Sequence, residues 1–330
     1  MTRRQFLRQA LAASALCGPF AALVLPGAAL AQNYPNRPVT LVVPFAPGGG
    51  TDSIAREMAV GLSQRLGKPV VVDNRGGAGG AIAAKQVASS PADGHTLLFV
   101  TSTFVTHVAA EPKPSYDAVK DFAPVAMIGR GPLMVVTRKG LGTATLEQIV
   151  AASKARPEGL SYCSSGVGGI NHMAGELFAQ KTGAVLSHVP YKGSGPATLD
   201  LLAGRIDVFF STVPTIQQYV KSGQVDLVAV TDTKRMAGYP NTPTAAEAGL
   251  KDFNISTWWG IVAPAGTPEP IVARLNGYIN EISASEAIKK RLTNEGAETY
   301  SMTSAQFKAA LGQETALWRG VAKAANIKTN

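Results

Sequence analysis

Between residues 39 and 52 the chain reads Val39-Thr40-Leu41-Val42-Val43-Pro44-Phe45-Ala46-Pro47-Gly48-Gly49-Gly50-Thr51-Asp52. The β-branched run predicts a strand from Val39 to Phe45, and the helix-period residues that follow predict a helix capped by Thr51 or Asp52. Glycines between the two let backbone N–H groups approach a ligand, and a helix N-terminus carries partial positive charge. The stretch therefore predicts an α/β fold and a loop suited to an anion.

Strand and helix patterns alternate in the same way along the rest of the chain, which is typical of an α/β protein with largely parallel sheets. One such unit extends from residue 39 to about residue 100, and a second from about residue 132 to residue 230. Two crossings, near Gly129 and near Phe253, join them. We therefore expect one domain of residues 32–130 and 256–330, a second of residues 131–255, and a ligand cleft between them beyond the carboxyl ends of the strands.

The first 31 residues have the parts of a signal peptide. A paired arginine, Arg3-Arg4, precedes a run rich in alanine and leucine that ends in Ala29-Leu30-Ala31. Pro19 and Pro26 interrupt this run, which is shorter than the roughly 20 apolar residues of a membrane-spanning helix. We expect export by the twin-arginine route, with the Sec route as the alternative, and cleavage after Ala31 to give a soluble periplasmic protein.

Composition limits the classes of function. The net charge is +9, and removal of residues 1–31 would leave 28 basic and 22 acidic residues, a net charge of +6. This surplus favours anionic ligands by long-range attraction, but the sequence lacks the Lys/Arg runs and interleaved aromatics of a nucleic-acid surface. Cys163 would be the one cysteine left after cleavage. We therefore expect no internal disulfide, no metal-binding Cys/His cluster and no cofactor.

Two further glycine-rich loops stand between a predicted strand and a predicted helix. One is Gly76-Gly77-Ala78-Gly79-Gly80, and the other is Ser164-Ser165-Gly166-Val167-Gly168-Gly169-Ile170-Asn171-His172. Taken alone, the loop at residues 44–52 is equally consistent with a structural turn, because it lacks the ending of a phosphate-binding P-loop and the spacing of a dinucleotide fingerprint. Together the three loops would supply amide and hydroxyl donors from both domains, which a carboxylate accepts well.

A periplasmic hydrolase is the main alternative from another class of function. The residue types of a hydrolytic triad are present in Ser164, Ser165, His172 and Asp207. The sequence has no Gly-x-Ser-x-Gly elbow to expose a nucleophile, so we expect no catalysis. His172 lies in the first turn of a predicted helix beside a glycine loop, where it either faces the cleft or caps the helix, and His188 is interpreted as structural.

Several stretches resemble the substrate-binding proteins of tripartite tricarboxylate transporters, the Bug or TctC-like family. They are spread over essentially the whole chain that follows the predicted signal peptide. The matching stretches are Tyr34-Pro35 with Arg37-Pro38, Val43-Pro44-Phe45-Ala46-Pro47-Gly48-Gly49, Val72-Asp73-Asn74-Arg75-Gly76-Gly77-Ala78-Gly79-Gly80, Ala92-Asp93-Gly94-His95-Thr96-Leu97, Tyr116-Asp117 with Lys120-Asp121-Phe122, His188-Val189-Pro190-Tyr191-Lys192-Gly193, and Ala263-Pro264-Ala265-Gly266-Thr267-Pro268.

The resemblance implies a bilobed periplasmic-binding-protein fold of type II, the Venus-flytrap type, with two α/β domains and a ligand cleft between them. It implies a solute-binding protein and not an enzyme, in which the first and third glycine loops hold the ligand carboxylate, partly through ordered water. It also implies two partners, the small and large membrane subunits of the transporter. We expect a monomer, and a periplasmic ligand sensor remains an alternative function.

Two departures from the family pattern bear on the ligand. Where family members commonly carry an Asn-Pro loop, this chain has Thr103-Phe104-Val105-Thr106-His107-Val108, so His107 would present a donor instead. Many amino-acid-binding members have an aspartate where this chain has Ser211, so an ammonium group would lack its counter-ion here. The ligand is therefore expected to be an acid without an amino group.

Arg130 and two phenylalanines point to a dicarboxylate. Arg130 either forms a bidentate pair with a carboxylate or lies on the hinge surface, and Phe45 and Phe104 either wall the cleft or belong to the core. If Arg130 pairs with a carboxylate and both phenylalanines wall the cleft, the ligand is an aromatic dicarboxylate such as terephthalate. The alternative is an aliphatic di- or tricarboxylate. The candidate ligand-binding residues are Phe45, Ala46, Pro47, Gly48, Gly49, Asp52, Ser102, Phe104, His107, Arg130, Ser164, Ser165, Gly166, Gly168, Asn171, His172 and Ser211.

Overall fold

The computed structural model describes residues 34–45, 47–48 and 50–327, so the predicted signal peptide lies outside the described residues. The described residues from Pro35 onward form one compact unit. No helix in the described part of the chain is both long and apolar enough to span a membrane.

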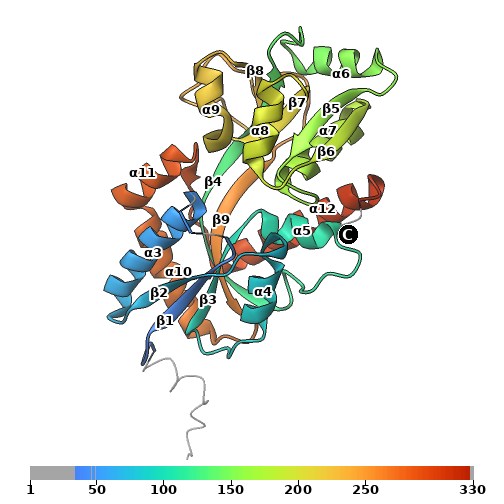
Figure 1. The fold of residues 1–330 in the computed structure, drawn as a ribbon. Helices are drawn as coiled ribbons and strands as arrows, with labels where there is room; N and C mark the ends of the chain where they lie inside the picture. Colours follow the sequence, from blue (N-terminus) through green and yellow to red (C-terminus); the bar gives the residue numbers. More distant parts are fainter. Residues whose placement is uncertain (1–33, 46, 49, 328–330) are drawn as a thin grey trace, which may run out of the picture. The chain divides into compact units, whose positions relative to one another are not determined.

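The first sheet begins with three parallel strands separated by helices (Figure 1). Val39 pairs with Val70, and Thr40 pairs with Thr96, so one central strand lies between the other two. Each strand ends in a loop that leads into a helix, as the sequence predicts for the first two strands. The elements in chain order are β1 (Val39–Val43), α3 (Gly50–Leu66), β2 (Val70–Asn74), η1 (Ala78–Gly80), α4 (Ala81–Ala88), β3 (Thr96–Thr101) and α5 (Thr103–Ala110).

Two long strands, β4 (Phe122–Arg138) and β9 (Ser256–Pro264), join the first sheet to a second. They run antiparallel from the Phe122–Pro264 pair to the Pro132–Ser256 pair, and Figure 1 shows them side by side at the centre of the molecule. From Leu133 onward β4 pairs instead with the strands of the second sheet. Strand β4 therefore belongs to both sheets, and it fixes the loops of one sheet relative to the loops of the other.

The second sheet repeats the strand-loop-helix pattern. Leu160 pairs with Leu186, and Tyr162 pairs with Val208, both in parallel register. The carboxyl ends of these strands therefore lie at one edge, as in the first sheet. The elements are α6 (Leu146–Lys154), β5 (Leu160–Ser164), α7 (Ile170–Thr182), β6 (Leu186–Pro190), α8 (Ser194–Leu202), β7 (Val208–Thr212), α9 (Val213–Lys221) and β8 (Val225–Val230).

The prediction of largely parallel sheets is wrong for the strands at the crossings. β9 is antiparallel to β3 and to β4, and β4 is antiparallel to β7 and β8. The reason is that β4 and β9 pass between the sheets in opposite directions, whereas strand-helix-strand units within each sheet keep one direction. Helix α5 and the part of β4 before Leu133 were also absent from the prediction.

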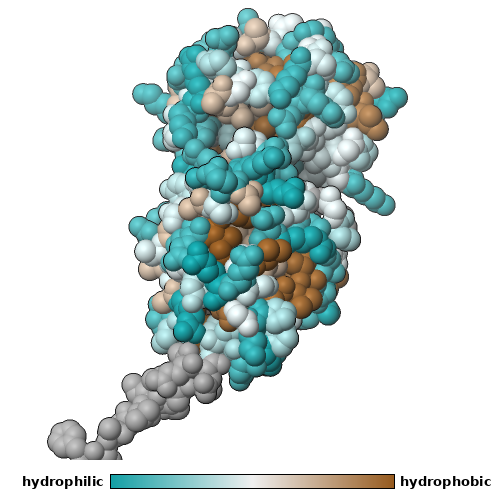
Figure 2. Space-filling view, turned by 90° about the vertical axis from the view of Figure 1, so that its left-hand side faces the viewer, coloured by the Kyte–Doolittle hydropathy of each residue, from teal (hydrophilic) through white to brown (hydrophobic). Residues whose placement is uncertain are grey.

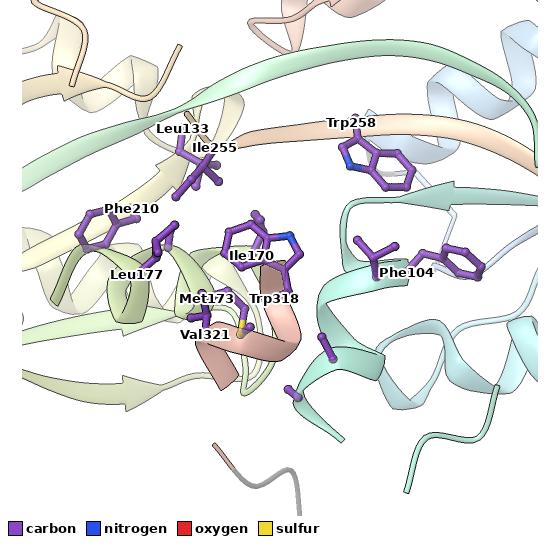
Figure 3. Packing of buried hydrophobic residues seen from close by; sticks show 14 of the residues in the cluster. Phe104, Leu133, Ile170, Met173, Leu177, Phe210, Ile255, Trp258, Trp318 and Val321 are labelled. Atoms are coloured by element: carbon purple, nitrogen blue, oxygen red, sulfur yellow. The ribbon is translucent and has the colours of Figure 1, made fainter. Parts of the chain in front are cut away.

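The C-terminal segment returns to both sheets. It contains α10 (Glu269–Ser283), α11 (Glu286–Asn294), the short β10 (Glu298–Thr299) and α12 (Ser304–Ala324). In Figure 3, Trp318 and Val321 of α12 lie beside Ile170 and Met173 of α7, and all four belong to one buried cluster. The side-chain amide of Gln180 donates a hydrogen bond to the Val321 carbonyl oxygen at 3.0 Å. Helix α12 thus contacts α7, a helix of the second sheet, and so connects the two parts of the fold.

Candidate ligand-binding site

The loop after β1 is organised around the Asp52 carboxylate, which is 3% exposed. The Gly48 N–H and Arg56 Nε both donate to Asp52 Oδ2 at 2.9 Å, and Asn74 Nδ2 donates to Oδ1 at 2.8 Å. Burial alone would raise the pKa of Asp52, but these donors and the Arg56 charge outweigh burial and hold the pKa below its ordinary value. Asp52 is ionised at neutral pH, and both of its oxygens serve to hold the loop.

Hydroxyl groups gather where the first sheet meets β9. Trp259 Nε1 donates to Thr51 Oγ1 at 3.2 Å, and Ser102 Oγ lies 3.4 Å from Thr257 Oγ1. Ser102 immediately follows β3, and its N–H donates to the Trp258 carbonyl oxygen at 3.2 Å. The start of β9 therefore contacts both the loop after β1 and the loop after β3, and so fixes their polar groups relative to each other.

The loop after β5 is closed by its own hydrogen bonds. Ser164 Oγ accepts from the Gly166 N–H at 3.2 Å and lies 2.7 Å from His188 Nε2. The Gly168 N–H donates to His172 Nδ1 at 3.1 Å. Gly166 has φ of +145° and Gly168 has φ of +76°, backbone conformations that side-chain-bearing residues rarely adopt. The shape of this turn therefore requires glycine at both positions.

Asn171 joins this loop to the end of β7. Its Oδ1 accepts from Ser165 Oγ at 3.0 Å, and its Nδ2 donates to the Phe210 carbonyl oxygen at 2.6 Å. The Asn171 side chain is 3% exposed, so both partners would be costly to replace. Ser211, the next residue along β7, is also buried. The structure thus brings Ser164, Ser165, Gly166, Gly168, Asn171, His172 and Ser211 together, as one would need for a shared site.

Behind the loop, two histidine rings stack. The His172 and His188 centroids are 3.7 Å apart with an interplanar angle of 8°. Burial lowers the pKa of His172 to about 4, and burial together with neighbouring His172 lowers the pKa of His188 to about 3. Both rings are neutral at neutral pH. They support the loop through shape and hydrogen bonding, without charge.

The arrangement does not assemble a hydrolytic triad. Asp207, the acidic candidate, accepts from Arg138 Nε at 2.9 Å and from the Ser161 N–H at 3.0 Å. Ser164 has His188 beside it, but a histidine whose pKa is about 3 is a poor general base near neutral pH. Among residues 34–45, 47–48 and 50–327, no group of three or more His, Cys, Asp or Glu side chains is placed to hold a metal ion.

Three of the other candidates contact different neighbours. The Phe104 ring centroid is 5.1 Å from that of Tyr116, in a buried aromatic cluster. His107 Nε2 lies 2.9 Å from Glu111 Oε1. The Arg130 guanidinium lies 4.1 Å over the centroid of the Tyr300 ring. Phe104 lines a small cavity together with Pro44, Phe45, Gly79 and Gly80, and the His107 ring lies beside Gly79, so these two side chains pack behind the first two glycine loops.

The rest of the first loop is only partly described. Phe45 is half-buried, and Pro47 and Gly48 are exposed. The Asn74 side-chain amide donates to the Phe45 carbonyl oxygen at 3.1 Å, which helps to hold the start of the loop. Ala46 and Gly49 lie outside the described residues.

Sequence reasoning missed three residues that support the loops, namely Asn74, Thr257 and Trp259, and it interpreted His188 as structural without placing it beside the loop. Asn74 ends the strand that pairs in parallel with β1, so its place at the same sheet edge was a usable signal. His188 is opposite Tyr162 in the register of two adjacent strands, and only that register places it behind the loop after β5. Thr257 and Trp259 reach the site through antiparallel pairing over a long sequence distance, which local patterns do not contain.

Comparison with known proteins agrees with this geometry. A model of the tripartite tricarboxylate transporter family receptor matches residues 54–327. The chain belongs to this family. Protein BugT of Bordetella pertussis is similar at 38% identity over 300 residues, which are 90% of this chain and 92% of that relative. The resemblance inferred from the sequence is thereby confirmed, and the protein is a substrate-binding receptor, not an enzyme.

Two solved structures of Rhodopseudomonas palustris proteins have the same fold. Rpa4515 with adipate is 36% identical, with a TM-score of 0.77, and the match covers 90% of this chain and 100% of that chain. MatC with bound malate is 32% identical, with a TM-score of 0.75, and the match covers 88% of this chain and 100% of that chain. The predicted bilobed periplasmic-binding-protein fold is therefore confirmed.

Proposed function

We propose that this receptor binds a small dicarboxylate in the periplasm, after export and cleavage following Ala31, and delivers it as a monomer to the small and large membrane subunits of its transporter. The observation that carries the proposal is the Asn171 bridge, which holds Ser165 and the end of β7 in one rigid polar wall. The donors of this bridge are used within it, so its role is to fix the loop that leads into the N-terminus of α7, where backbone N–H groups and partial positive charge suit a carboxylate.

The facing wall in this proposal comes from the first sheet. There the loop after β1 is tied down by Asp52, and Thr51 and Ser102 bring hydroxyl groups to the same edge. We assign residues 32–130 with 256–330 to one domain and residues 131–255 to the other. The change of β4 partners between Pro132 and Leu133 supports that boundary. Ligand contact with both walls would favour the closed arrangement of the domains.

An aliphatic dicarboxylate of the size of adipate or malate is the ligand class that we favour. The aromatic ligand predicted from the sequence, terephthalate, depended on Phe45 and Phe104 as flat walls and on Arg130 as a cation in the cleft. Phe104 packs against Tyr116, and Arg130 lies over Tyr300, so neither side chain supports that ligand. Relatives of this family have been solved with adipate and with malate, which favours the aliphatic class.

Isothermal titration calorimetry on the purified protein tests the proposal. We expect adipate or malate to bind more tightly than terephthalate, and Asn171→Ala to weaken that binding by roughly tenfold, which is about 1.4 kcal/mol. Asn241→Ala, at an exposed asparagine, is the matched control and should leave the affinity unchanged. Absence of binding for all three acids would overturn the proposed ligand class. Tighter binding of terephthalate would overturn the preference for an aliphatic ligand.

A further inference from the structure

A second pocket lies apart from the glycine loops. It is a cavity of about 510 Å³ between α9, the segment that follows β8, and the α11–β10 turn. Figure 1 places α9 and α11 on the left-hand side, and Figure 2, which views that side, shows hydrophilic side chains gathered across its middle. No residue of the three glycine loops is among those that line this pocket. The proposed dicarboxylate site therefore does not account for the residues of this pocket.

Basic side chains dominate the charged lining. Arg130, Lys221, Lys234 and Arg235 face two acidic residues, Asp232 and Glu298. Lys234 Nζ is paired with Glu298 Oε2 at 2.9 Å, and Arg235 Nε is paired with Glu247 Oε2 at 2.8 Å. The other two cations, Arg130 and Lys221, form no ion pair with any residue in the described part of the chain. Asp232 is the one lining carboxylate without an ion-pair partner in the described part of the chain, so the lining keeps a positive balance, which attracts an anion.

Arg130 is held in place by a ring contact and not by an ion pair, and its charge also acts on the buried Glu314, whose pKa is raised by burial to about 7. Its guanidinium stacks over the Tyr300 ring at 4.1 Å, a contact that fixes the plane of the group and leaves its N–H donors available. A planar guanidinium held in this way is suited to a bidentate pair with a carboxylate. Lys221 lies in the last turn of α9 and is exposed, so it can supply a second, adjustable charge.

The pocket also has an apolar side. Val213, Met236 and Tyr239 line it, and the Tyr239 hydroxyl donates to the Gln217 carbonyl oxygen at 3.4 Å, which orients the ring. A bare inorganic anion would leave this side uncovered. The volume lies within the roughly 300–1,000 Å³ typical of small-molecule sites.

We propose that this pocket is a second binding site, which takes a small organic anion with an aryl or alkyl body. The carboxylate of that anion pairs with Arg130 and Lys221, and its body covers Met236 and Tyr239. The site is independent of the dicarboxylate site proposed above. Its lining comes from both sheets, since Arg130 belongs to β4 beside β9, whereas Val213 and Lys221 belong to α9.

Benzoate is the probe for the test, titrated calorimetrically into the purified protein at low ionic strength, where surface charges are least screened. We expect Arg130→Gln and Lys221→Gln each to weaken benzoate binding, by roughly tenfold for Arg130→Gln and less for the exposed Lys221→Gln. Lys251→Gln removes an exposed lysine that does not line this pocket and should have no effect. Lys221→Gln changes an exposed side chain only, so it remains informative if Arg130→Gln fails to fold.

Asn171→Ala separates the two sites. Benzoate binding should persist in that variant, even where adipate binding is weakened. If wild-type protein binds no benzoate, or if Asn171→Ala removes the binding while both pocket variants retain it, the pocket is not the site. If inorganic phosphate binds the pocket as tightly as benzoate, the apolar side contributes nothing and the proposed class of ligand is wrong.

Discussion

The glycine-rich loop after β1 is held by a charged side chain, whereas the loop after β5 is held by neutral ones. Asp52 gathers the Gly48 N–H, Arg56 and Asn74 around a single carboxylate. The loop after β5 depends instead on the amide of Asn171 and on the stacked, neutral rings of His172 and His188. Two loops with similar sequence patterns are therefore held in shape by different interactions, one by a charged carboxylate and the other by neutral hydrogen bonds and ring stacking.

The difference has consequences for how each loop fails. A buried carboxylate that accepts from three groups holds them in one arrangement, and its removal leaves all three donors without their acceptor at once. Removal of a buried amide that bridges two groups affects only the partners of those two hydrogen bonds. Neutral histidines add a sensitivity to acid, because protonation would place charge in a buried stack.

The largest effect should follow removal of the carboxylate after β1. Asp52→Ala leaves the Gly48 N–H and the Arg56 and Asn74 side chains without their shared acceptor, and we expect a loss of about 3 kcal/mol in the free energy of unfolding. Urea unfolding followed by circular dichroism measures it. Asp226→Ala removes an exposed carboxylate that pairs with Lys139 and should cost less than about 1 kcal/mol. Equal losses in the two variants would contradict a supporting role for Asp52.

A smaller loss is expected at the bridge after β5. Asn171→Ala removes the donor to the buried Phe210 carbonyl oxygen and the acceptor of Ser165 Oγ, and we expect a cost of about 2 kcal/mol. The same unfolding experiment measures it, with Asn241→Ala as the exposed control. A destabilisation larger than that of Asp52→Ala would reverse the ranking of the two supports.

The contributions of the two loops to stability should be lost in different pH ranges as the protein is acidified. The pKa values of His172 and His188 fall from 6.5 in the unfolded chain to about 4 and about 3 in the folded chain, so the unfolded state binds more protons in this range. Stability from this pair is fully present above pH 6.5 and is lost as pH falls through about 4 and about 3. The Asp52 contribution is lost only below 3.8, because its pKa is lowered from that value.

Unfolding measured between pH 7 and pH 4 tests this difference. Across that range the histidine pair should cost the wild-type protein on the order of 2 kcal/mol relative to a variant without it, a value reduced from the full shift because the two rings are coupled. The comparison with that variant is needed because burial raises the pKa of Glu314 to about 7, which makes an opposite contribution in the same range in both proteins. His172→Gln combined with His188→Gln should lose much less over the same range. His107→Gln, outside the stack, is the control. A double variant with the slope of the wild type would show that other groups cause the acid sensitivity.

Most elements of the fold could be predicted because each carries its own period. The strand from Val39 and the helix from Asn171, for example, match β1 and α7 within a few residues. The first part of β4 was missed, because Pro124 and Gly129 interrupt the strand pattern there and coincide with irregular register. Its partner β9 lies far along the sequence, so no local signal indicates the antiparallel pairing.

The candidate site was predicted unevenly for a related reason. Asn171 and His172 stand beside a glycine loop in the sequence, and the structure places their side chains within its hydrogen bonds. Phe104 and Arg130 were chosen by residue type, and their neighbours Tyr116 and Tyr300 depend on packing that the local sequence does not encode. Residue type indicates what a side chain can bind, but tertiary contacts determine what it does bind.

The smallest expected effect concerns Arg56, the charged partner of Asp52. Its side chain is 52% exposed, so solvent screens its attraction to the carboxylate, and Arg56→Gln should cost about 0.5 kcal/mol. The Gly48 N–H and Asn74 remain on the two carboxylate oxygens and keep the loop in shape. Unfolding in low and high salt measures the effect, which should shrink as salt rises in the wild type. If Arg56→Gln were as damaging as Asp52→Ala, the ion pair rather than the buried hydrogen bonds would hold the loop, and the contrast with the neutral loop after β5 would be sharper still.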